Sequence, residues 1–260
     1  MTTVYLHNTI FCDRFSSDIT IGEKEICMVA EKKILIIIPA YNEADNIVRV
    51  VKEITDNFPQ YDYVVVNDGS TDTTRKVCKD NAINLLDLPV NLGLSGAIRS
   101  GMKYANYYGY DYAVQLDGDG QHCPEYIEDM LKCMETTQAD IVIGSRYKTE
   151  KKPFTARMIG SQIITYAIWL TTKGKYIGDV TSGMRLFNKK MIKMFGYRIN
   201  YRPEPDTLAF LVNHGVKIEE VQVAMRERVA GTSYLNLKSS FYYMLHMLFN
   251  ILVFQWVRKD

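Results

Sequence analysis

The sequence predicts an α/β fold with a mostly parallel, doubly wound sheet and an apolar helix near its C-terminal end. Two observations support this fold class. Five short apolar runs, of the kind found in buried strands, alternate with segments of helical periodicity up to residue 147. Polar or glycine-rich segments follow several of these runs, at the strand ends where such sheets bind ligands. The 260 residues, 47% of them hydrophobic, suffice for one large buried core.

The first half of the chain gives a regular order of elements. Residues 34–38 are an unbroken run of Ile and Leu, typical of a strand buried on both faces, and Pro39 is expected to end it. A helix is expected over residues 43–58, because apolar residues recur there on one stripe. The other strands are expected at residues 63–66, 84–88, 111–117 and 139–147, and the other helices after the turn at 67–72, after Gly96 and at 124–134.

The second half has a different texture. A polar, basic loop after residue 147 leads into the largely apolar segment 159–172. This segment is interpreted either as a core helix or, because basic residues precede it, as a helix on an anionic membrane surface. Residues 178–192 return to strand and helix, and a further helix and strand are expected at 204–213 and 218–223.

The last apolar run, residues 241–257, contains the polar residues His246, Asn250 and Gln255. A helix of this length is about 25 Å long, which is short for a membrane span of about 20 apolar residues. It is also too apolar on all sides for an ordinary surface helix. We therefore expect it to lie in a membrane interface, against a membrane partner or in an oligomer contact, with burial in the core as the alternative.

Three segments are expected: residues 1–31, an extension to which no role is assigned; residues 32–235, the main domain; and residues 236–260, an associating helix. The chain has 31 Lys and Arg against 30 Asp and Glu, which argues against nucleic acid as a partner. The five cysteines show no C-x-x-C spacing, as in a reduced cytosolic protein. Acidic residues interrupt the first 31 residues, so a secretory signal is not expected.

The segment DYAVQLDGDGQH, residues 111–122, is central to the functional prediction. Its apolar half is a predicted strand, and the turn after it holds Asp117, Asp119 and Gln121. Carboxylate and amide oxygens suit Mg²⁺ or Mn²⁺, which bind substrate phosphate oxygens at the same time. The segment indicates a site for a metal ion and a nucleotide diphosphate, although a turn with solvated aspartates fits this motif alone equally well. We interpret the adjacent His122 as structural, because the site is already rich in oxygen.

Seven motifs in order resemble those of the family 2 glycosyltransferases and, within them, the polyprenyl-phosphate sugar synthases, including the dolichyl-phosphate mannose synthases. The motifs are PAYNE (39–43), NDGSTD (67–72), NLGLSGAIRSG (91–101), LDGDGQH (116–122), GSRY (144–147), DVTSGMRLF (179–187) and R-x-x-G-x-S (228–233). The resemblance covers about residues 33–235 and implies the nucleotide-diphospho-sugar transferase (GT-A) fold. Cys123 is a departure, because the family often has a proline directly after the histidine.

The resemblance also implies the residues that bind the donor. Those expected at the nucleotide base and ribose are Pro39, Tyr41, Glu43 and Asp68, and each lies just past a predicted strand. Helix capping or the helix dipole would account for Glu43 and Asp68 without any such function. Binding is favoured because two such sites face the same crevice.

Catalytic roles are implied for Asp117 and Asp119 at the metal ion and for Arg228 near the phosphates, and Gln121 completes the implied metal site. The residues implied for the acceptor phosphate are Arg146, Arg157 and Ser161. Two of these are four residues apart and therefore lie on one helix face. Arginine suits phosphate because its planar fork donates two parallel hydrogen bonds. A solvated surface is the alternative for each of these arginines.

The predicted function is a metal-dependent, inverting transfer of a hexose from a nucleotide-diphospho-sugar to a polyprenyl phosphate, undecaprenyl or dolichyl, for cell-surface glycan synthesis. A lipid phosphate is largely anionic near pH 7, so no general base is required. One alternative is transfer to a hydroxyl of a lipid-linked or surface polysaccharide, which requires a base, with Glu204 and Asp206 as candidates. Another alternative is a non-catalytic subunit that binds a nucleotide sugar within a membrane complex.

The expected location is the cytoplasmic face of the membrane, with peripheral attachment. The resemblance adds the membrane surface as a partner. A small membrane-anchor protein or a second copy of the chain is a further expected partner, because the chain has a single doubtful apolar helix at its end.

Overall fold

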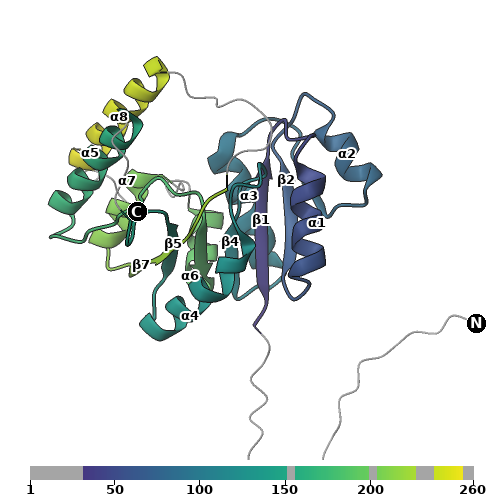
Figure 1. The fold of residues 1–260 in the computed structure, drawn as a ribbon, viewed down its shortest axis with the longest axis horizontal. Coiled ribbons are helices and arrows are strands. Elements are labelled where there is room, and N and C mark those ends of the chain that lie inside the picture. Colours follow the sequence, from purple (N-terminus) through teal and green to yellow (C-terminus); the bar gives the residue numbers. More distant parts are fainter. Residues whose placement is uncertain (1–31, 151–155, 199–203, 227–236, 254–260) are drawn as a thin grey trace, which may run out of the picture. The chain divides into compact units, whose positions relative to one another are not determined.

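The computed structural model describes residues 32–150, 156–198, 204–226 and 237–253 (Figure 1). The chain divides into a unit of Met1–Glu31, which lies outside the described residues, and a unit of Lys32–Asp260. The second unit contains a seven-stranded sheet in the order β3-β2-β1-β4-β6-β5-β7. The strands are β1 (Ile34–Ala40), β2 (Asp62–Asn67), β3 (Leu85–Asp87), β4 (Tyr112–Gln115), β5 (Ile141–Ser145), β6 (Arg185–Asn188) and β7 (Ile218–Gln222).

Strand β6 is antiparallel to both of its neighbours, β4 and β5. The other strand pairs are parallel, which confirms the mostly parallel sheet that the sequence predicts. Because Arg185 at the start of β6 pairs with Gln115 at the end of β4, the loop that enters β6 lies beside the carboxyl end of β4. This loop, residues 179–184, will be called the β6-entry loop.

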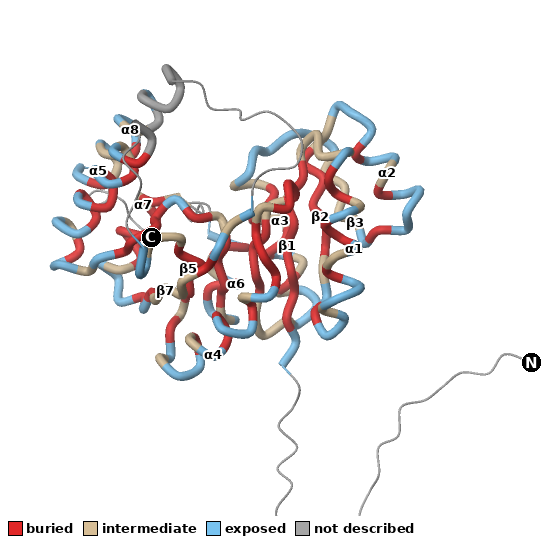
Figure 2. The backbone as a smooth tube through the Cα atoms, in the orientation of Figure 1, coloured by how far each residue is buried: buried red, intermediate tan, exposed pale blue. Residues whose placement is uncertain are grey.

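Helices cover both faces of the sheet because β1 buries side chains on both. Leu35 and Ile37 belong to a cluster with α3 and α6, whereas Ile36 and Ile38 pack with α1 and α4. Figure 2 shows this central strand as buried throughout most of its length. The helices are α1 (Ile47–Asn57), α2 (Thr74–Asp80), α3 (Gly93–Tyr107), η1 (Pro124–Tyr126, a 3₁₀ turn), α4 (Ile127–Thr137), α5 (Ala156–Thr171), α6 (Lys189–Tyr197), α7 (Pro205–Asn213) and α8 (Leu237–Leu252).

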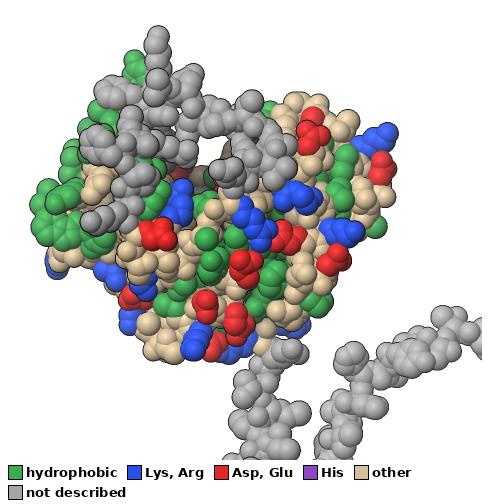
Figure 3. All heavy atoms as spheres, in the orientation of Figure 1, with side chains coloured by type: hydrophobic (Ala, Val, Ile, Leu, Met, Phe, Trp, Pro, Cys, Tyr) green, Lys and Arg blue, Asp and Glu red, His purple; other side chains and the backbone are tan. Residues whose placement is uncertain are grey.

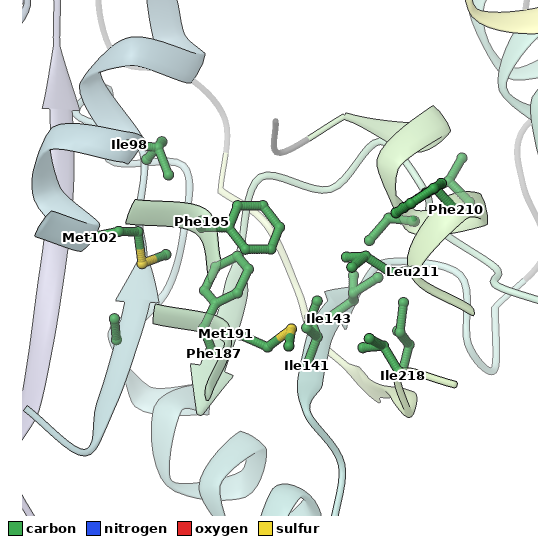
Figure 4. Packing of buried hydrophobic residues seen from close by; sticks show 14 of the residues in the cluster. Ile98, Met102, Ile141, Ile143, Phe187, Met191, Phe195, Phe210, Leu211 and Ile218 are labelled. Carbon is green, nitrogen blue, oxygen red and sulfur yellow. The ribbon is translucent and has the colours of Figure 1, made fainter. Parts of the chain in front are cut away.

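The cluster on the α3 side joins the two halves of the sheet. Phe187 of β6 and Phe195 of α6 are fully buried, and their ring centroids are 5.0 Å apart. Figure 4 shows these rings between Met102 of α3 and Ile141 of β5. The apolar packing therefore fixes β6, and with it the β6-entry loop, against the first half of the chain.

Two predicted boundaries at the first strand are wrong. Pro39 does not end β1, which continues to Ala40. The pairing of β1 with β4 ends at Ile37. Pro39, which has no N–H to donate, therefore interrupts no hydrogen bond between β1 and β4. The helix begins at Ile47 rather than at residue 43. Residues 43–46 form a turn instead, in which the carbonyl oxygen of Glu43 accepts the N–H of Asn46 at 3.0 Å.

Helices α5, α7 and α8 pack on one another beside the sheet. Met247 and Ile251 of α8 are buried in the same cluster as Ile164 and Ile168 of α5. One side of α8 is therefore part of the core, as in the alternative reading of the last apolar run, while its other side is exposed. Among the described residues, the structure has no helix with the length and hydrophobicity to cross a membrane.

Candidate functional site

A pocket of about 350 Å³ opens at the carboxyl ends of β1 and β2, beside the turn that follows β4. Residues predicted for nucleotide and metal binding line it together, namely Pro39, Tyr41, Glu43, Asp68, Asp117 and Asp119. The other lining residues are Ala40, Asn91, Gly93, Leu94, Ala97 and Gly118. The structure thus gathers two sets of predicted residues in one cavity, although their nearest members, Asp68 and Asp117, are 49 positions apart in the sequence.

The loops after β1 and β2 are tied together by Asn42. Its backbone has φ of 57°, a left-handed conformation that asparagine tolerates better than most residues. Its side-chain oxygen accepts hydrogen bonds from the N–H groups of Thr71 at 2.9 Å and Asp72 at 3.3 Å. Its own N–H donates to the hydroxyl of Ser70 at 3.0 Å. These bonds join the loop after β1 to the loop after β2 at the rim of the pocket.

Asp68 is buried, with 3% of its surface exposed, and lines the pocket from the end of β2. Its Oδ1 accepts the N–H of Leu92 at 2.7 Å, which connects the second loop to the segment before α3. Gly69 makes this approach feasible: its φ is 63°, and a Cβ there would lie 2.6 Å from the backbone N of Asn91. Asp68 therefore lines the pocket and also connects two of the segments that surround it.

Glu43 also combines a position in the pocket with a local structural contact. It lines the pocket, and its N–H donates to the hydroxyl of Thr74 at 2.9 Å. Its carboxylate accepts a hydrogen bond from the side-chain amide of Asn46 at 2.8 Å, just before α1 begins. Glu43 thus makes local structural contacts before α1, as the structural alternative predicts, and it also lines the cavity.

The acidic turn wraps around the guanidinium of Arg49 from α1. Nη2 of Arg49 donates to the backbone oxygen of Asp119 at 3.2 Å. Gly120 has φ of 77°, and a Cβ on it would lie 2.6 Å from the same nitrogen. The Oδ1 atom of Asp119 accepts the N–H of Gln121 at 3.0 Å, and Asp119 is 5% exposed. These contacts hold the turn in a defined conformation, unlike a solvated loop.

Asp117 sits between His122 and the β6-entry loop. Its N–H donates to Nδ1 of His122 at 2.9 Å, and its side chain is 38% exposed. Gly183 leaves room for the carboxylate, because a Cβ there would lie 2.8 Å from Oδ2 of Asp117. Two segments far apart in the sequence thus shape the surroundings of this one carboxylate.

The donor set suits a hard divalent cation. Two carboxylates, Asp117 and Asp119, face one cavity, and the space left by Gly183 gives the first of them an open side. Among the described residues, no group of three His, Cys, Asp or Glu side chains gathers to hold a metal by itself. A cation here would take its remaining ligands from amide, water or substrate oxygens, as Mg²⁺ commonly does.

Gln121, the third predicted metal ligand, is not among the residues that line the pocket. Its Nε2 donates to the backbone oxygen of Arg226 at 3.3 Å, and its own backbone oxygen accepts the N–H of Arg226 at 3.0 Å. This contact joins the acidic turn to the end of the segment that follows β7. The side-chain oxygen is the atom of Gln121 with metal-ligand chemistry.

Arg146, predicted for the acceptor phosphate, forms a bidentate ion pair with the buried Asp179 of the β6-entry loop. Burial alone would lower the pKa of Arg146 and raise that of Asp179. Their mutual hydrogen bonds and opposite charges outweigh burial, so the pKa of Asp179 is lowered and that of Arg146 is raised. Glu220 holds this loop in turn, accepting the N–H groups of Gly178 at 2.8 Å and Asp179 at 2.9 Å.

The other acceptor-site predictions are placed only in part. Ser161 lies in α5 and is 5% exposed. Arg157 also belongs to α5, but its side chain lies outside the described residues, as does Arg228 as a whole. The i, i+4 relationship expected for the first two is therefore present in one helix, whereas their approach to the pocket stays a prediction.

The two candidate bases are not among the residues that line the pocket. Glu204 precedes α7, and its carboxylate lies 3.5 Å from the hydroxyl of Ser95 near the start of α3. Asp206 faces α8 instead, where its Oδ2 is 3.5 Å from the side-chain nitrogen of Asn250. Of the two, Glu204 is the one placed near a helix that lines the cavity.

Sequence reasoning missed several contributions to the site. Asn91, Leu94 and Ala97 line the pocket, and the motif that holds them was identified without roles for these residues. Glu220 lies outside every motif, and nothing in the sequence signalled its bond to the β6-entry loop. Contacts of this kind depend on strand order, which single-sequence patterns do not give.

Comparisons with known proteins find similar sequences and similar folds. The family model described as glycosyl transferase family 2 matches residues 35–195. The chain is 29% identical over 224 residues to a UDP-N-acetylglucosamine–dolichyl-phosphate N-acetylglucosaminyltransferase of Methanococcus voltae, with 75% of this chain and 86% of that protein covered. It is 27% identical to a polyprenol monophosphomannose synthase of Mycolicibacterium smegmatis, with 82% of this chain and 84% of that protein covered.

A similar solved structure is glucosyl-3-phosphoglycerate synthase from Mycobacterium tuberculosis, in complex with Mn²⁺, UDP and phosphoglyceric acid. The TM-score is 0.62 at 15% identity, with 85% of this chain and 79% of that chain covered. At this identity the likeness is one of fold. It confirms the predicted GT-A fold.

Proposed function

Since the chain belongs to glycosyl transferase family 2, we propose that it transfers a hexose from a nucleotide-diphospho-sugar to a polyprenyl phosphate. The family assignment makes the chain an enzyme, as the sequence predicts, rather than a non-catalytic binding subunit. The relatives named above act, by their names, on dolichyl phosphate or form a polyprenol monophosphate sugar. Their names support the class of acceptor, while the sugar and the base stay undefined.

The single observation that supports this function best is the shared pocket of the nucleotide and acidic residues. Tyr41 and Asp68 line the same pocket as Asp117 and Asp119. A nucleotide diphosphate would bind with its base and ribose near the first two residues and its diphosphate near the second two. The 350 Å³ cavity is of the size usual for ligands of this class.

Asp117, Asp119 and the side-chain oxygen of Gln121 would hold a Mg²⁺ or Mn²⁺ ion here. The ion, when bound, would neutralise the negative charge on the departing nucleoside diphosphate. The fold neighbour with 15% identity was crystallised with Mn²⁺ and UDP, which supports a divalent ion without fixing which one. Arg49 of α1 supports the turn that carries Asp119 by donating to the backbone oxygen of this residue at 3.2 Å.

The acceptor supplies its own nucleophile. A phosphate monoester with a second pKa near 6 is largely dianionic at neutral pH, so its oxygen attacks the anomeric carbon without a base. The bond from this oxygen to the sugar forms as the bond to the donor diphosphate breaks. Attack in line with the leaving group inverts the anomeric configuration. The protein contributes by positioning the two reactants and by stabilising charge.

The acceptor phosphate would bind beside the pocket, at Arg146, Arg157 and Ser161. Asp179 presents the guanidinium of Arg146 in a fixed orientation, with Nε and Nη2 engaged and the side chain 25% exposed. Arginine has five N–H donors, so the pair leaves others for a phosphate. Ser161 in α5 would add a hydroxyl, and Arg228 would add charge near the leaving group.

The polyprenyl chain would lie along the α5–α8 apolar face, and this face would contact the membrane surface. Figure 3 shows hydrophobic side chains gathered where Figure 1 places these two helices. Tyrosine and tryptophan, which favour bilayer interfaces, are among them. The α5–α8 apolar face consists of Ile159, Ile163, Tyr166, Trp169, Leu170, Tyr242, Leu245, Phe249, Leu252 and Val253, each at least 43% exposed.

A lipid bilayer is the occupant that best accounts for this face, because α5 carries both the face and Ser161. A phosphate headgroup and an apolar chain would then meet at one helix. We propose that the chain acts at the cytoplasmic side of the membrane, as a peripheral protein in cell-surface glycan synthesis. A small membrane-anchor protein or a second copy of the chain would occupy the same face if bilayers do not.

The rival acceptor is a hydroxyl, and Glu204 gives it some support. This carboxylate lies near the start of α3, whose first turn lines the pocket. Asp206, which contacts α8, is the weaker base candidate. A base within reach of the pocket would be needed only if the nucleophile were a hydroxyl.

The test is transfer from a panel of radiolabelled nucleotide sugars to undecaprenyl or dolichyl phosphate with Mg²⁺ or Mn²⁺. We expect a metal-dependent lipid product in the wild type that disappears in Asp119→Ala and in Arg157→Ala. Arg75→Ala is the matched control, because Arg75 is an exposed arginine that pairs with Asp87 and does not line the pocket. This control should keep wild-type activity.

Donor hydrolysis without lipid product would favour the hydroxyl acceptor, if Asp119→Ala abolishes it and Arg157→Ala does not. Glu204→Gln would then identify the base. Absence of both transfer and hydrolysis with every donor would overturn the proposed function.

A further inference from the structure

We propose that His122 is a positioning residue that fixes the carboxylate of Asp117 through its Nε2–H group. This inference rests on the proposed metal and diphosphate site, and it assigns that site a residue outside the expected ligand set. The motif-level interpretation of His122 was purely structural. The contacts of its two ring nitrogens indicate more.

The ring is oriented by its first nitrogen. Nδ1 of His122 accepts the backbone N–H of Asp117 at 2.9 Å. In a neutral imidazole one nitrogen accepts and the other carries the proton, so the proton is on Nε2. The side chain is 1% exposed, and it cannot exchange this donor with water.

The second nitrogen points at the carboxylate of the same aspartate. Nε2 lies 3.7 Å from Oδ2 of Asp117, slightly beyond hydrogen-bond length. Within the described part of the chain, this buried nitrogen has no hydrogen-bond partner. A buried donor without a partner is energetically unfavourable, because it has lost its hydrogen bonds to water. Such a group calls for an explanation, and catalytic hydrogen bonds that close only in the complex are one.

The carboxylate needs only a small rotation to close this gap. The χ2 torsion of aspartate has a broad minimum, so turning the carboxylate by a modest angle is inexpensive. Gly183 leaves the space in which Oδ1 and Oδ2 move, since a Cβ there would lie within 3.1 Å of both oxygens and 3.0 Å from Cε1 of His122. A side chain at position 183 would therefore collide with both His122 and the carboxylate of Asp117.

The histidine is itself held from the opposite side. His122 forms an antiparallel bridge with Met225, and Arg226 donates its N–H to the oxygen of Gln121. Arg226 is anchored by ion pairs with Glu53 at 2.6 Å and Glu125 at 3.2 Å. The imidazole therefore has a fixed position against which the carboxylate is oriented.

Hydrogen bonds to ligating carboxylates orient them toward a metal, and losing such a bond typically costs about 10–100-fold in metal affinity. The two functions of His122 are separable by substitution. His122→Asn keeps an acceptor near Nδ1 and removes the donor at Nε2. His122→Gln places an amide donor near Nε2 and removes the acceptor for the N–H of Asp117.

The experiment measures Mn²⁺ binding by electron paramagnetic resonance of free Mn²⁺, with UDP or GDP present, together with the melting temperature of each variant. We expect His122→Asn to melt near the wild type and to bind Mn²⁺ 10–100-fold more weakly. His122→Gln should melt lower and keep a larger share of the Mn²⁺ affinity. His214→Asn, at a histidine after α7 that contacts Phe210, is the control and should bind Mn²⁺ as the wild type does.

Wild-type Mn²⁺ affinity in His122→Asn would overturn the inference and leave the proposed function standing. The inference is equally overturned if both variants lose affinity only in proportion to their loss of stability. Absence of Mn²⁺ binding in the wild type would overturn the metal site and this inference together, whereas sugar transfer with retained Mn²⁺ binding in His122→Asn would overturn the inference alone.

Discussion

Arg146 and Asp179 are joined by two short hydrogen bonds, with Nε 2.7 Å from Oδ2 and Nη2 2.9 Å from Oδ1. Asp179 is fully buried, while the Arg146 side chain is 25% exposed. The N–H of Arg146 adds a third bond to the same carboxylate at 3.2 Å. The pair fixes the β6-entry loop to the residue that directly follows β5. We therefore expect both the stability of the chain and its binding of the acceptor phosphate to depend on the carboxylate of Asp179.

Removing the charge of Asp179 should make the free energy of unfolding less dependent on pH in the acidic range. Because the folded pKa of Asp179 is lowered, its contribution is complete above the unfolded pKa of about 4 and is lost as the pH falls through the folded pKa. We expect Asp179→Asn to lose about 3 kcal/mol of unfolding free energy at pH 7 and less at pH 3. Urea unfolding at both pH values measures this. Equal losses at both, or a similar loss in the exposed control Asp80→Asn, would contradict it.

The same substitution should affect the two substrates differently. Without Asp179 the guanidinium of Arg146 is no longer held, so the KM for polyprenyl phosphate should rise about tenfold. The KM for the nucleotide sugar should stay near the wild-type value, because Asp179 does not line the donor pocket. Steady-state kinetics with each substrate varied in turn gives both values. A rise in the KM for the nucleotide sugar alone would contradict the assignment of Arg146 to the acceptor phosphate.

Gly183→Ala should impair activity far more than stability. The added Cβ would lie 2.8 Å from Oδ2 of Asp117 and displace that carboxylate. We expect at least a tenfold loss of sugar transfer with a melting temperature within a few degrees of the wild type. The matched control is Gly196→Ala in α6, where the nearest atoms would be 3.4 Å away. This control should keep activity and be slightly more stable, since alanine favours helices. Full activity in Gly183→Ala would show that the position of Asp117 is unimportant.

Two substitutions at Asp68 should separate its structural and binding functions. Asp68→Asn keeps an oxygen for the N–H of Leu92, whereas Asp68→Ala removes it. We expect both variants to bind nucleoside diphosphate about tenfold more weakly or worse. Only Asp68→Ala should also lose about 1–3 kcal/mol of unfolding free energy, because it leaves a donor unsatisfied. Titration calorimetry and urea unfolding measure the two effects. Wild-type affinity in Asp68→Asn would exclude a role in binding.

Charges on the α5–α8 apolar face should weaken membrane association. Leu170 is 69% exposed and Phe249 is 56% exposed, so Leu170→Glu and Phe249→Glu should fold normally. We expect each to reduce cosedimentation with anionic phospholipid vesicles severalfold. Transfer to a short-chain, water-soluble polyprenyl phosphate should stay unchanged. Tyr107→Glu, on the exposed surface of α3, is the control. Unchanged vesicle binding together with a loss of dimers in solution would assign the face to a second copy of the chain.

The sequence was sufficient for much of the fold, because its strands are short, apolar and bounded by turns. It could not show that Pro39 lies inside β1, since this depends on where the pairing with β4 stops. Asp117 and Asp119 could be located as a pair from their motif, and Asp68 from its place after a strand. The contacts of Gly183 with Asp117, and of Asp179 with Arg146, depend on the insertion of β6 between β4 and β5. Strand order of this kind is set by packing across the whole sheet.

The antiparallel insertion of β6 has a consequence for how the chain is made. On the ribosome, β4 emerges well before Arg185–Asn188, and β6 then pairs with its free side. Until it does, a nascent chain presents the unpaired N–H and C=O groups of β4, an edge that promotes association with other chains. The strand that covers this edge also delivers Gly183 to Asp117. Covering the edge of β4 and bringing Gly183 to Asp117 therefore depend on the same strand.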